Sequence, residues 1–193
     1  MILGSQSPRR KEILNFFNIP FTVHPSDFDE NIVPFEGDPA AYAMTLASKK
    51  AEVLSKKFPS DVIICADTVV FCKGKIYNKP RDKAQAREFL SELSAEAHKV
   101  VTAVSISLAD KKFCEAETTN ILFNKLSDQM IEQYISHFAF SDKAGGYAIQ
   151  QGGGIIVSKI EGCYYNVMGL PLNTLSRLLL KFDIDLWKHL KVF

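Results

Sequence analysis

Hydrophobic and polar positions along this chain follow two periodicities, and the first is that of β-strands. Residues 62–66 and 69–71 are almost wholly apolar, which is typical of a central strand buried on both faces. Residues 99–108 alternate and are rich in β-branched side chains, and a tight turn leads from them into a second strand-like segment, residues 113–123. This pair predicts an antiparallel hairpin. Shorter apolar runs at residues 1–3, 21–24 and 155–160 predict further strands.

The second periodicity is helical and occurs between these strands. Apolar residues at three- and four-residue spacing predict helices over residues 9–17, 40–58, 82–93, 129–138 and 172–180. Pro8 and Pro39 suit the first position of a helix, so Ser7 and Asp38 are the expected N-caps. The interleaved elements predict an α/β fold with flanking helices around a mixed central sheet. We expect a single domain over residues 1–193, with two lobes around a substrate cleft, because polar loops recur at strand ends.

Composition and charge narrow the classes of function. The 193 residues carry a formal net charge of +1 and are 47% hydrophobic, as in ordinary globular proteins. So small a net charge argues against a nucleic acid or a membrane surface as a partner, and any anion site must come from a local cluster. The four cysteines form no Cys-x-x-Cys pair, and the N-terminus lacks a basic leader followed by an apolar run. We therefore expect a cytoplasmic protein with reduced thiols and no membrane-spanning segment.

The first candidate site lies where the first strand turns into the first helix. Residues 4–7 form a small polar turn, and Arg9 and Arg10 follow in the first turn of the helix. Cations are unfavourable there, because a helix N-terminus carries partial positive charge. Hydroxyl, backbone N–H and guanidinium groups together suit a phosphate, which makes Ser5, Arg9 and Arg10 candidate phosphate ligands. The alternative is that both arginines are solvated and pair with Glu12 or another carboxylate.

A second candidate site surrounds Asp67, which follows five apolar residues and precedes three more after Thr68. A carboxylate at the end of a buried strand must be paired, hydrogen-bonded or bound to metal, so catalysis competes with a turn cap or a lysine pair. Glu30, in an acidic loop, offers a second hard oxygen ligand of the kind that Mg²⁺ prefers. Lys50 and Lys79 are candidate cations. Lysines on helices are usually solvated, but Lys79 precedes a proline that restricts its backbone at a strand end.

The third candidate is the glycine-rich segment of residues 142–154. Gly145 and Gly146 allow backbone conformations or close approaches that larger residues forbid. Tyr147 offers an aromatic face, and Gln150 offers an amide that both donates and accepts hydrogen bonds. These features suit recognition of a nucleobase. The alternative is a glycine-rich hairpin with a half-buried tyrosine.

Taken together, these segments resemble the Maf family, also called the septum-formation-inhibitor-like family. Each motif is weak alone, but they occur in the family's order across nearly the whole chain. They are Ser5-Gln-Ser-Pro-Arg-Arg10, Asp29-Glu30, Lys50-Ala51, Ala66-Asp-Thr-Val-Val70, Lys79-Pro80, His98 with Thr102, Asp142-Lys-Ala-Gly-Gly-Tyr-Ala-Ile-Gln150 and Gly162-Cys-Tyr-Tyr-Asn-Val-Met-Gly-Leu-Pro171. The resemblance implies a Maf/ITPase-like fold.

The resemblance also implies a function. Members of the family are house-cleaning nucleoside triphosphate pyrophosphatases that release the monophosphate and pyrophosphate with a divalent cation such as Mg, Mn or Co. The string from Asp142 to Gln150 resembles the branch that acts on dTTP and UTP, including some modified pyrimidine nucleotides. Two alternatives stay open: the branch that acts on 7-methyl-GTP, and a non-enzymatic nucleotide-binding regulator of cell division. A homodimer is a family-level expectation.

We hypothesise a role for each candidate residue. The triphosphate is bound by Ser5, Arg9, Arg10, Lys50 and Lys79, and the base is read by Tyr147 and Gln150. Glu30 and Asp67 bind the divalent cation or position its water. Asp67 is the predicted catalytic residue that activates the nucleophile, because a buried carboxylate can hold geometry and tune its pKa. In-line attack on the α-phosphorus would then expel pyrophosphate.

Overall fold

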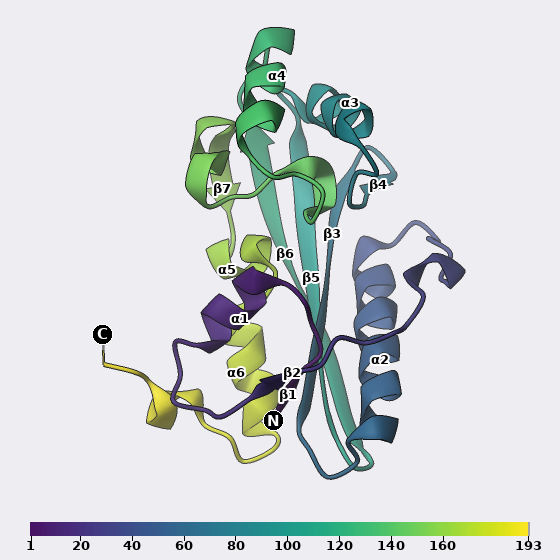
Figure 1. Ribbon diagram of the computed structural model, residues 1–193, viewed down its shortest axis with the longest axis vertical. Coiled ribbons are helices and arrows are strands. Elements are labelled where there is room, and N and C mark those ends of the chain that lie inside the picture. The colour runs from purple at the N-terminus through teal and green to yellow at the C-terminus, as the bar shows by residue number, and fades with distance from the viewer. Residues whose placement is uncertain (193) are drawn as a thin grey trace.

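The computed structural model describes residues 1–192, whose seven strands form one mixed sheet. Three long strands run through the molecule: β3 (Ile63–Cys72), β5 (Ala97–Leu108) and β6 (Lys111–Phe123) (Figure 1). The short strands are β1 (Ile2–Leu3), β2 (Thr22–Val23), β4 (Lys75–Tyr77) and β7 (Val157–Glu161). The order is β2-β1-β3-β5-β6-β7, with β4 paired to β3. β1 is parallel to β2 and β3, and the other pairs are antiparallel.

One edge of β3 is only partly covered by other strands. β1 pairs with β3 at Ile63 and Ile64, and β4 pairs with it from Val70 to Cys72. Residues 65–69 pair with β5 on one side, and no described strand pairs with them on the other. The gap arises because β1 is only two residues long and β4 only three, so that β4 ends opposite Val70. The middle of β3 therefore borders an opening in the sheet.

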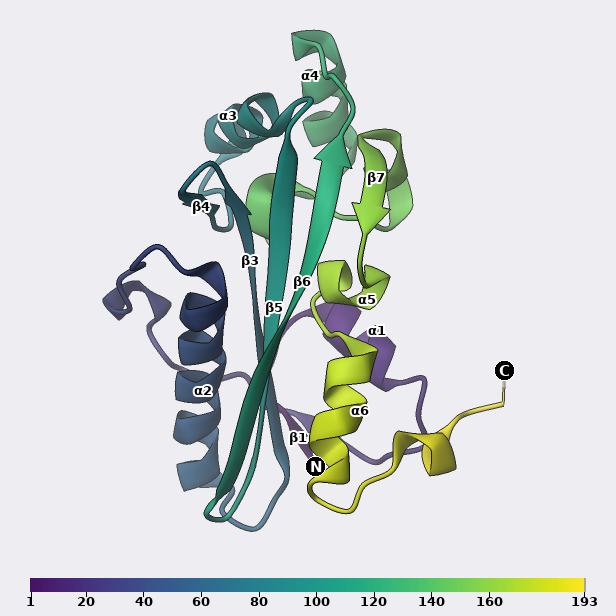
Figure 2. The same ribbon diagram turned by 180° about the vertical axis from the view of Figure 1, so that it is seen from behind.

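Helices cover both faces of the long strands. The α-helices are α1 (Pro8–Leu14), α2 (Pro39–Lys57), α3 (Lys83–Leu93), α4 (Asp128–His137), α5 (Tyr164–Met168) and α6 (Leu172–Leu180). Short 3₁₀ helices are η1 (Glu30–Ile32), η2 (Ala144–Gly146), η3 (Gln151–Ile155) and η4 (Leu186–His189). Figures 1 and 2 show α2 on one side of the strands and α1 with α6 on the other. Helices α3 and α4 lie together at one end of the long strands, at the top of both views, and α2, α1 and α6 lie nearer the other end.

Alternation along β5 separates two apolar cores. Val104 and Ile106 belong to the cluster that contains α1 and α6, whereas Val101 and Ala103 belong to the cluster that contains α2. Successive side chains of a strand point to opposite faces, so one strand serves both layers. A further cluster joins α3 and α4 to the far ends of the long strands. The clusters with α1, α6 and α2 lie in one group of elements, and the cluster with α3 and α4 forms the other. These two groups are the predicted lobes.

Most predicted elements are confirmed, and their caps explain why. Helix α6 has the predicted bounds. The side chains of Asp38, Asp82 and Ser127 accept backbone N–H groups at the starts of α2, α3 and α4, which satisfies donors that the first helical turn leaves unpaired. Ser7 is the N-cap residue of α1, but its side chain makes no capping hydrogen bond.

Three predictions about elements were wrong. The strand predicted to end at Asp67 and Thr68 continues to Cys72, because β5 pairs with it from Ile63 to Phe71. The predicted loop of residues 162–171 contains helix α5, which Gly169 ends with a left-handed φ of 102°. The predicted helix of residues 9–17 ends at Leu14. Among residues 1–192, none of the helices combines the length and the apolar character that crossing a bilayer requires.

Candidate active site

A cavity of about 570 Å³ lies beside the gap in the edge of β3. Its walls come from the turn after β1, from β3, from α2, from the loop after β4 and from the glycine-rich segment. Every candidate residue from the sequence lines this cavity: Ser5, Arg9, Arg10, Glu30, Lys50, Asp67, Lys79, Tyr147 and Gln150. The fold thus brings together side chains that are scattered over most of the chain, while their roles stay predictions.

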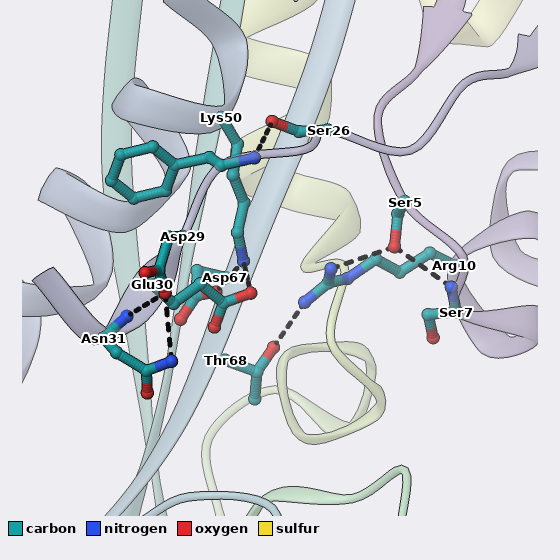
Figure 3. Close-up of polar contacts among 11 residues, drawn as sticks. Ser5, Ser7, Arg10, Ser26, Asp29, Glu30, Asn31, Lys50, Asp67 and Thr68 are labelled. Carbon is teal, nitrogen blue, oxygen red and sulfur yellow. Dashed lines mark hydrogen bonds and ion pairs between the residues drawn. The ribbon is translucent and has the colours of Figure 1, made fainter. Parts of the chain in front are cut away.

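Asp67 and Glu30 share one cation in the cavity wall. The Lys50 Nζ lies 2.5 Å from Asp67 Oδ1 and 2.7 Å from Glu30 Oε1 (Figure 3). The side chain of Asp67 is 8% exposed and that of Lys50 is 12% exposed, whereas Glu30 is 47% exposed. Two carboxylates and a lysine therefore meet at the boundary between the protein interior and the cavity.

The strand geometry explains how two neighbouring residues reach different partners. Asp67 and Thr68 are consecutive in β3, so their side chains leave opposite faces of the strand. Asp67 meets Lys50 from α2, and Thr68 meets Arg10 from α1 (Figure 3). Both side chains still border the cavity, because the edge of β3 is uncovered at this point.

The environment of Asp67 favours its protonated form more than water does. Burial raises the pKa of Asp67, the contact with Lys50 opposes this effect, and the neighbouring carboxylate of Glu30 raises the pKa further. Its Oδ1 accepts a hydrogen bond from Lys50, whereas no described residue donates to Oδ2. Asp67 is therefore oriented through one oxygen and has the other available.

Three protein acceptors hold the guanidinium group of Arg10. Nε donates to the carbonyl of Gly169 at 2.7 Å. One η-nitrogen donates to Ser5 Oγ at 3.1 Å, and the other donates to Thr68 Oγ1 at 3.0 Å (Figure 3). A guanidinium has five N–H donors, so donors remain on both η-nitrogens for a ligand. Burial lowers the pKa of Arg10, and the charge of Asp67 opposes that effect. The sequence made Ser5 and Arg10 candidate phosphate ligands, but it did not predict the hydrogen bond between them.

Arg9 also lines the cavity, and it contacts the first residue of the glycine-rich segment. One η-nitrogen donates to Asp142 Oδ2 at 2.9 Å, and the other donates to the Asp142 carbonyl at 3.2 Å. The same carboxylate forms an ion pair with Lys143, whose side chain is 10% exposed and which also lines the cavity. Asp142 thus neutralises two cations at once, as a phosphate group would. Neither Asp142 nor Lys143 was predicted to have a role, although a lysine within the motif from Asp142 to Gln150 could have indicated a further cation.

The glycine-rich segment forms part of the cavity wall and is tied to a neighbouring loop. Gly145 and Gly146 have φ values of 70° and 74°, so both need a conformation that glycine adopts readily. The amide of Gly145 donates to the carbonyl of Asn78 at 3.2 Å, next to Lys79. Lys79 itself is exposed and forms no ion pair with a described residue. Its amino group is therefore available to an anion in the cavity.

The two residues predicted to read a base differ in their surroundings. Tyr147 is only 5% exposed, its hydroxyl lies 2.8 Å from His98 Nε2, and its ring packs edge-on against Phe123. The tyrosine therefore anchors the segment in the core, and its ring offers little surface for stacking. Gln150 is half-buried, and its Oε1 is buried without a hydrogen-bond partner among the described residues. An unsatisfied buried acceptor is costly, so a ligand donor at this position would be favoured.

Comparisons with known proteins identify the family of this chain. A family model described as "Maf-like protein" matches residues 1–182. The chain belongs to the Maf family. A Chlamydia caviae protein named dTTP/UTP pyrophosphatase is 48% identical over 98% of this chain and 97% of its own length. A Chlamydia trachomatis protein of the same name is 42% identical over the same shares, as is a Chlamydia muridarum protein named nucleoside triphosphate pyrophosphatase. The aligned part of this Maf chain, 98% of its length, thus includes the segments in which the motifs described above lie.

A solved structure supports the fold of this Maf chain. The Staphylococcus aureus Ham1 protein superposes with a TM-score of 0.53 and 16% identity, covering 95% of this chain and 98% of its own. At this identity the likeness concerns the fold alone. It confirms the prediction of a Maf/ITPase-like α/β fold.

The Maf site offers two carboxylates to a metal ion. Among residues 1–192, no three His, Cys, Asp or Glu side chains converge as a metal-binding group. Glu30 and Asp67 nevertheless lie against the same cation, Lys50 Nζ, so their oxygens are close enough to share a ligand. Mg²⁺ is commonly held by one or two carboxylates together with substrate phosphates and waters. The donor set therefore fits a divalent cation that arrives with a phosphorylated substrate.

Proposed function

We propose that this chain is a nucleoside triphosphate pyrophosphatase that hydrolyses dTTP and UTP, and modified pyrimidine nucleotides, to the monophosphate and pyrophosphate. The names of relatives at 42–48% identity over nearly the whole length support the proposal. The observation that carries it is the position of Asp67, a buried carboxylate at the wall of a cavity whose other walls hold several cations.

The cations of the cavity would bind the triphosphate. Arg10 has donors left on both η-nitrogens, and its orientation is fixed by three protein acceptors. A fixed guanidinium can make two parallel hydrogen bonds to phosphate oxygens. Lys79 adds a point charge, and Arg9 and Lys143 would exchange the carboxylate of Asp142 for a phosphate group. In our proposal these contacts would hold the α-phosphorus for in-line attack by water and would offset the charge of the leaving pyrophosphate.

Asp67 would act as the general base. Its pKa is raised by burial, which makes it a stronger proton acceptor than an ordinary aspartate. In this structure Lys50 holds Oδ1, so Oδ2 is the oxygen that would take the proton of a water molecule while the water oxygen bonds to the α-phosphorus. The bond between the α-phosphorus and the bridging oxygen breaks, and pyrophosphate leaves with that electron pair. The proton on Asp67 then returns to solvent.

We further propose that a divalent cation, Mg, Mn or Co, takes part. Glu30 and Oδ1 of Asp67 would hold it together with oxygens of the substrate. Lys50 would then turn from Oδ1 toward the phosphates, and Oδ2 of Asp67 would remain the base. When bound, such an ion supplies positive charge that stabilises the phosphate oxygens and lowers the pKa of bound water. Loss of activity in a chelator, restored by each metal in turn, tests this part of the proposal.

The base would lie against the glycine-rich segment. The unsatisfied Gln150 Oε1 would accept a hydrogen bond from the N3–H of thymine or uracil, and its amide N–H₂ would donate to a ring carbonyl. A purine of the 7-methyl-GTP branch presents a different edge and needs more room. The pyrimidine preference is thus the part of the proposal that depends on the shape of this wall.

The test is a panel of nucleoside triphosphates with pyrophosphate detection. We expect the highest kcat/KM for dTTP and UTP. Asp67→Asn should lower kcat by about two to four orders of magnitude, the range typical of a lost general base. Asp110→Asn, in the exposed turn between β5 and β6, is the matched control and should keep full activity. Full activity in folded Asp67→Asn would contradict the role of Asp67, and binding without turnover would favour a regulator.

Two expectations from the sequence belong to the same proposal. We propose a cytoplasmic location and a homodimer as the working form. Sedimentation velocity at micromolar concentration measures the second, and a monomer under assay conditions would contradict it.

A further inference from the structure

A chain of buried polar groups lies behind Arg10 and outside the cavity. Thr68 Oγ1, which accepts from Arg10, lies 2.9 Å from Thr102 Oγ1, and that hydroxyl lies 2.8 Å from the carbonyl of Asn166. Thr102 and Asn166 are both fully buried. Neither lines the cavity, although Thr68 does. The sequence motifs contained both residues, and the proposed reaction gives them no task.

The number of hydrogens on each hydroxyl fixes the donor and the acceptor of every hydrogen bond in this series of buried groups. The Thr102 hydroxyl has one hydrogen, and it donates that hydrogen to the carbonyl of Asn166. Between the two threonines, therefore, Thr68 must be the donor and Thr102 the acceptor. The single hydrogen of Thr68 is then used, so toward Arg10 its oxygen can only accept. The hydrogen bonds from Thr68 through Thr102 to Asn166 therefore present Arg10 with a defined acceptor, the Thr68 oxygen, rather than with a freely rotating hydroxyl.

Asn166 also fixes the short helix that supplies the second acceptor of Arg10. Its Oδ1 accepts from the backbone N–H of Thr102 at 3.1 Å, and its Nδ2 donates to the carbonyl of Val100 and to Thr119 Oγ1, both at 2.9 Å. These bonds tie α5 to β5 and β6. Gly169 follows α5, and its carbonyl accepts from Arg10 Nε at 2.7 Å.

Two of the three acceptors that orient Arg10 thus depend on Asn166, one through Thr102 and Thr68 and one through α5. The third, Ser5, lies on the turn that precedes Arg10. Gly169 leaves little freedom here, since a Cβ on it would lie 3.1 Å from Thr68 Oγ1 and 3.4 Å from Arg10 Nε. The guanidinium is therefore held from behind by a rigid, fully bonded network.

We propose that Thr102 and Asn166 are positioning residues that hold the Arg10 guanidinium in the plane in which it grips a substrate phosphate. This inference rests on the proposed function of Arg10 as a phosphate ligand. A bidentate grip needs a fixed plane, and small misplacements of a binding group lower affinity and rate strongly. The role explains why hydroxyl and amide groups occupy fully buried positions on β5 and α5.

The test is a double-mutant cycle read by binding. Thr102→Val keeps the shape of the side chain but removes the hydroxyl, and Thr102→Ser keeps the hydroxyl as the matched control. Arg10→Lys keeps the charge but lacks the planar fork. The probe is the α,β-imido analogue of dTTP, which is not hydrolysed at the α-phosphorus, and affinity is measured by calorimetry with Mg²⁺ present. Melting by circular dichroism checks that each variant folds.

We expect Thr102→Val to weaken analogue binding about tenfold in the wild-type background, the scale of a hydrogen bond to a charged group. Thr102→Ser should stay within about twofold of wild type, and in the Arg10→Lys background Thr102→Val should change affinity less than about twofold. Asn166→Asp, which loses both N–H donors, should follow Thr102→Val in both backgrounds. Equal losses in the two backgrounds would overturn the positioning role, because they would show an effect independent of Arg10.

Two further outcomes are informative. If Thr102→Val fails to fold, Thr68→Val breaks the same series of hydrogen bonds one link closer to Arg10, at a half-buried position. Equal losses of affinity from Thr68→Val in the wild-type and Arg10→Lys backgrounds would overturn the inference in the same way. Wild-type protein that binds the analogue but hydrolyses no triphosphate contradicts the proposed function alone. The binding cycle remains readable in that case, so the two failures are distinguishable.

Discussion

Acid should destabilise this protein through one buried histidine. His98 on β5 is 3% exposed, its Nε2 lies 2.8 Å from the hydroxyl of Tyr147, and its ring packs edge-on against Phe123. Burial lowers the pKa of His98 to about 4, and a backbone hydrogen bond at Glu96 opposes that effect in part. The folded protein therefore keeps this imidazole neutral over a pH range in which the unfolded chain protonates it.

The size of the effect follows from the two pKa values. The unfolded chain binds a proton at His98 near pH 6.5, whereas the folded protein resists it until about pH 4. Below pH 6.5 the unfolded state therefore binds more protons, so stability falls as the pH falls. At 1.36 kcal/mol per pH unit, the loss between pH 7 and pH 4 amounts to about 3 kcal/mol. That is a large share of the roughly 5–15 kcal/mol that stabilises a typical domain.

The assay is urea unfolding of wild type and His98→Gln at several pH values between 7.5 and 4. Glutamine cannot titrate, and its amide can still bond to Tyr147. Other groups titrate in both proteins, so they cancel in the difference between the two free energies of unfolding. We expect this difference to shift by about 3 kcal/mol in favour of the variant as the pH falls from 7 to 4. Parallel pH dependences for the two proteins would refute the reasoning.

Two substitutions test the packing and the charge balance of the site by the same urea assay at pH 7.5. Lys50→Met should cost about 3–5 kcal/mol because it leaves the buried carboxylate of Asp67 unpaired, and adding Asp67→Asn should recover most of that loss. No recovery would show that Lys50 stabilises by packing. Gly4→Ala should cost about 1–3 kcal/mol, because its Cβ would lie 2.6 Å from Leu54 Cδ1. Gly154→Ala, in open space, is its control and should be neutral.

The sequence alone determined most of the elements and the family. Periodicity distinguishes helices from strands because one face of each must be buried, and local caps such as Asp38 mark where helices begin. The motifs identified the Maf family and the residues that line one cavity. These signals are local, so each can be recognised without knowing what the rest of the chain does.

Tertiary structure alone decided how those residues meet. Asp67 borders the cavity because two short strands leave a gap along β3, and strand pairing between distant segments sets that gap. The contact between Arg9 and Asp142 joins residues 133 positions apart, and the bond between Thr102 and Asn166 joins residues 64 apart. Tyr147 turned out to anchor the core rather than to present a free ring, since burial depends on what packs around it. Register and burial arise from contacts between distant segments, and no local pattern records them.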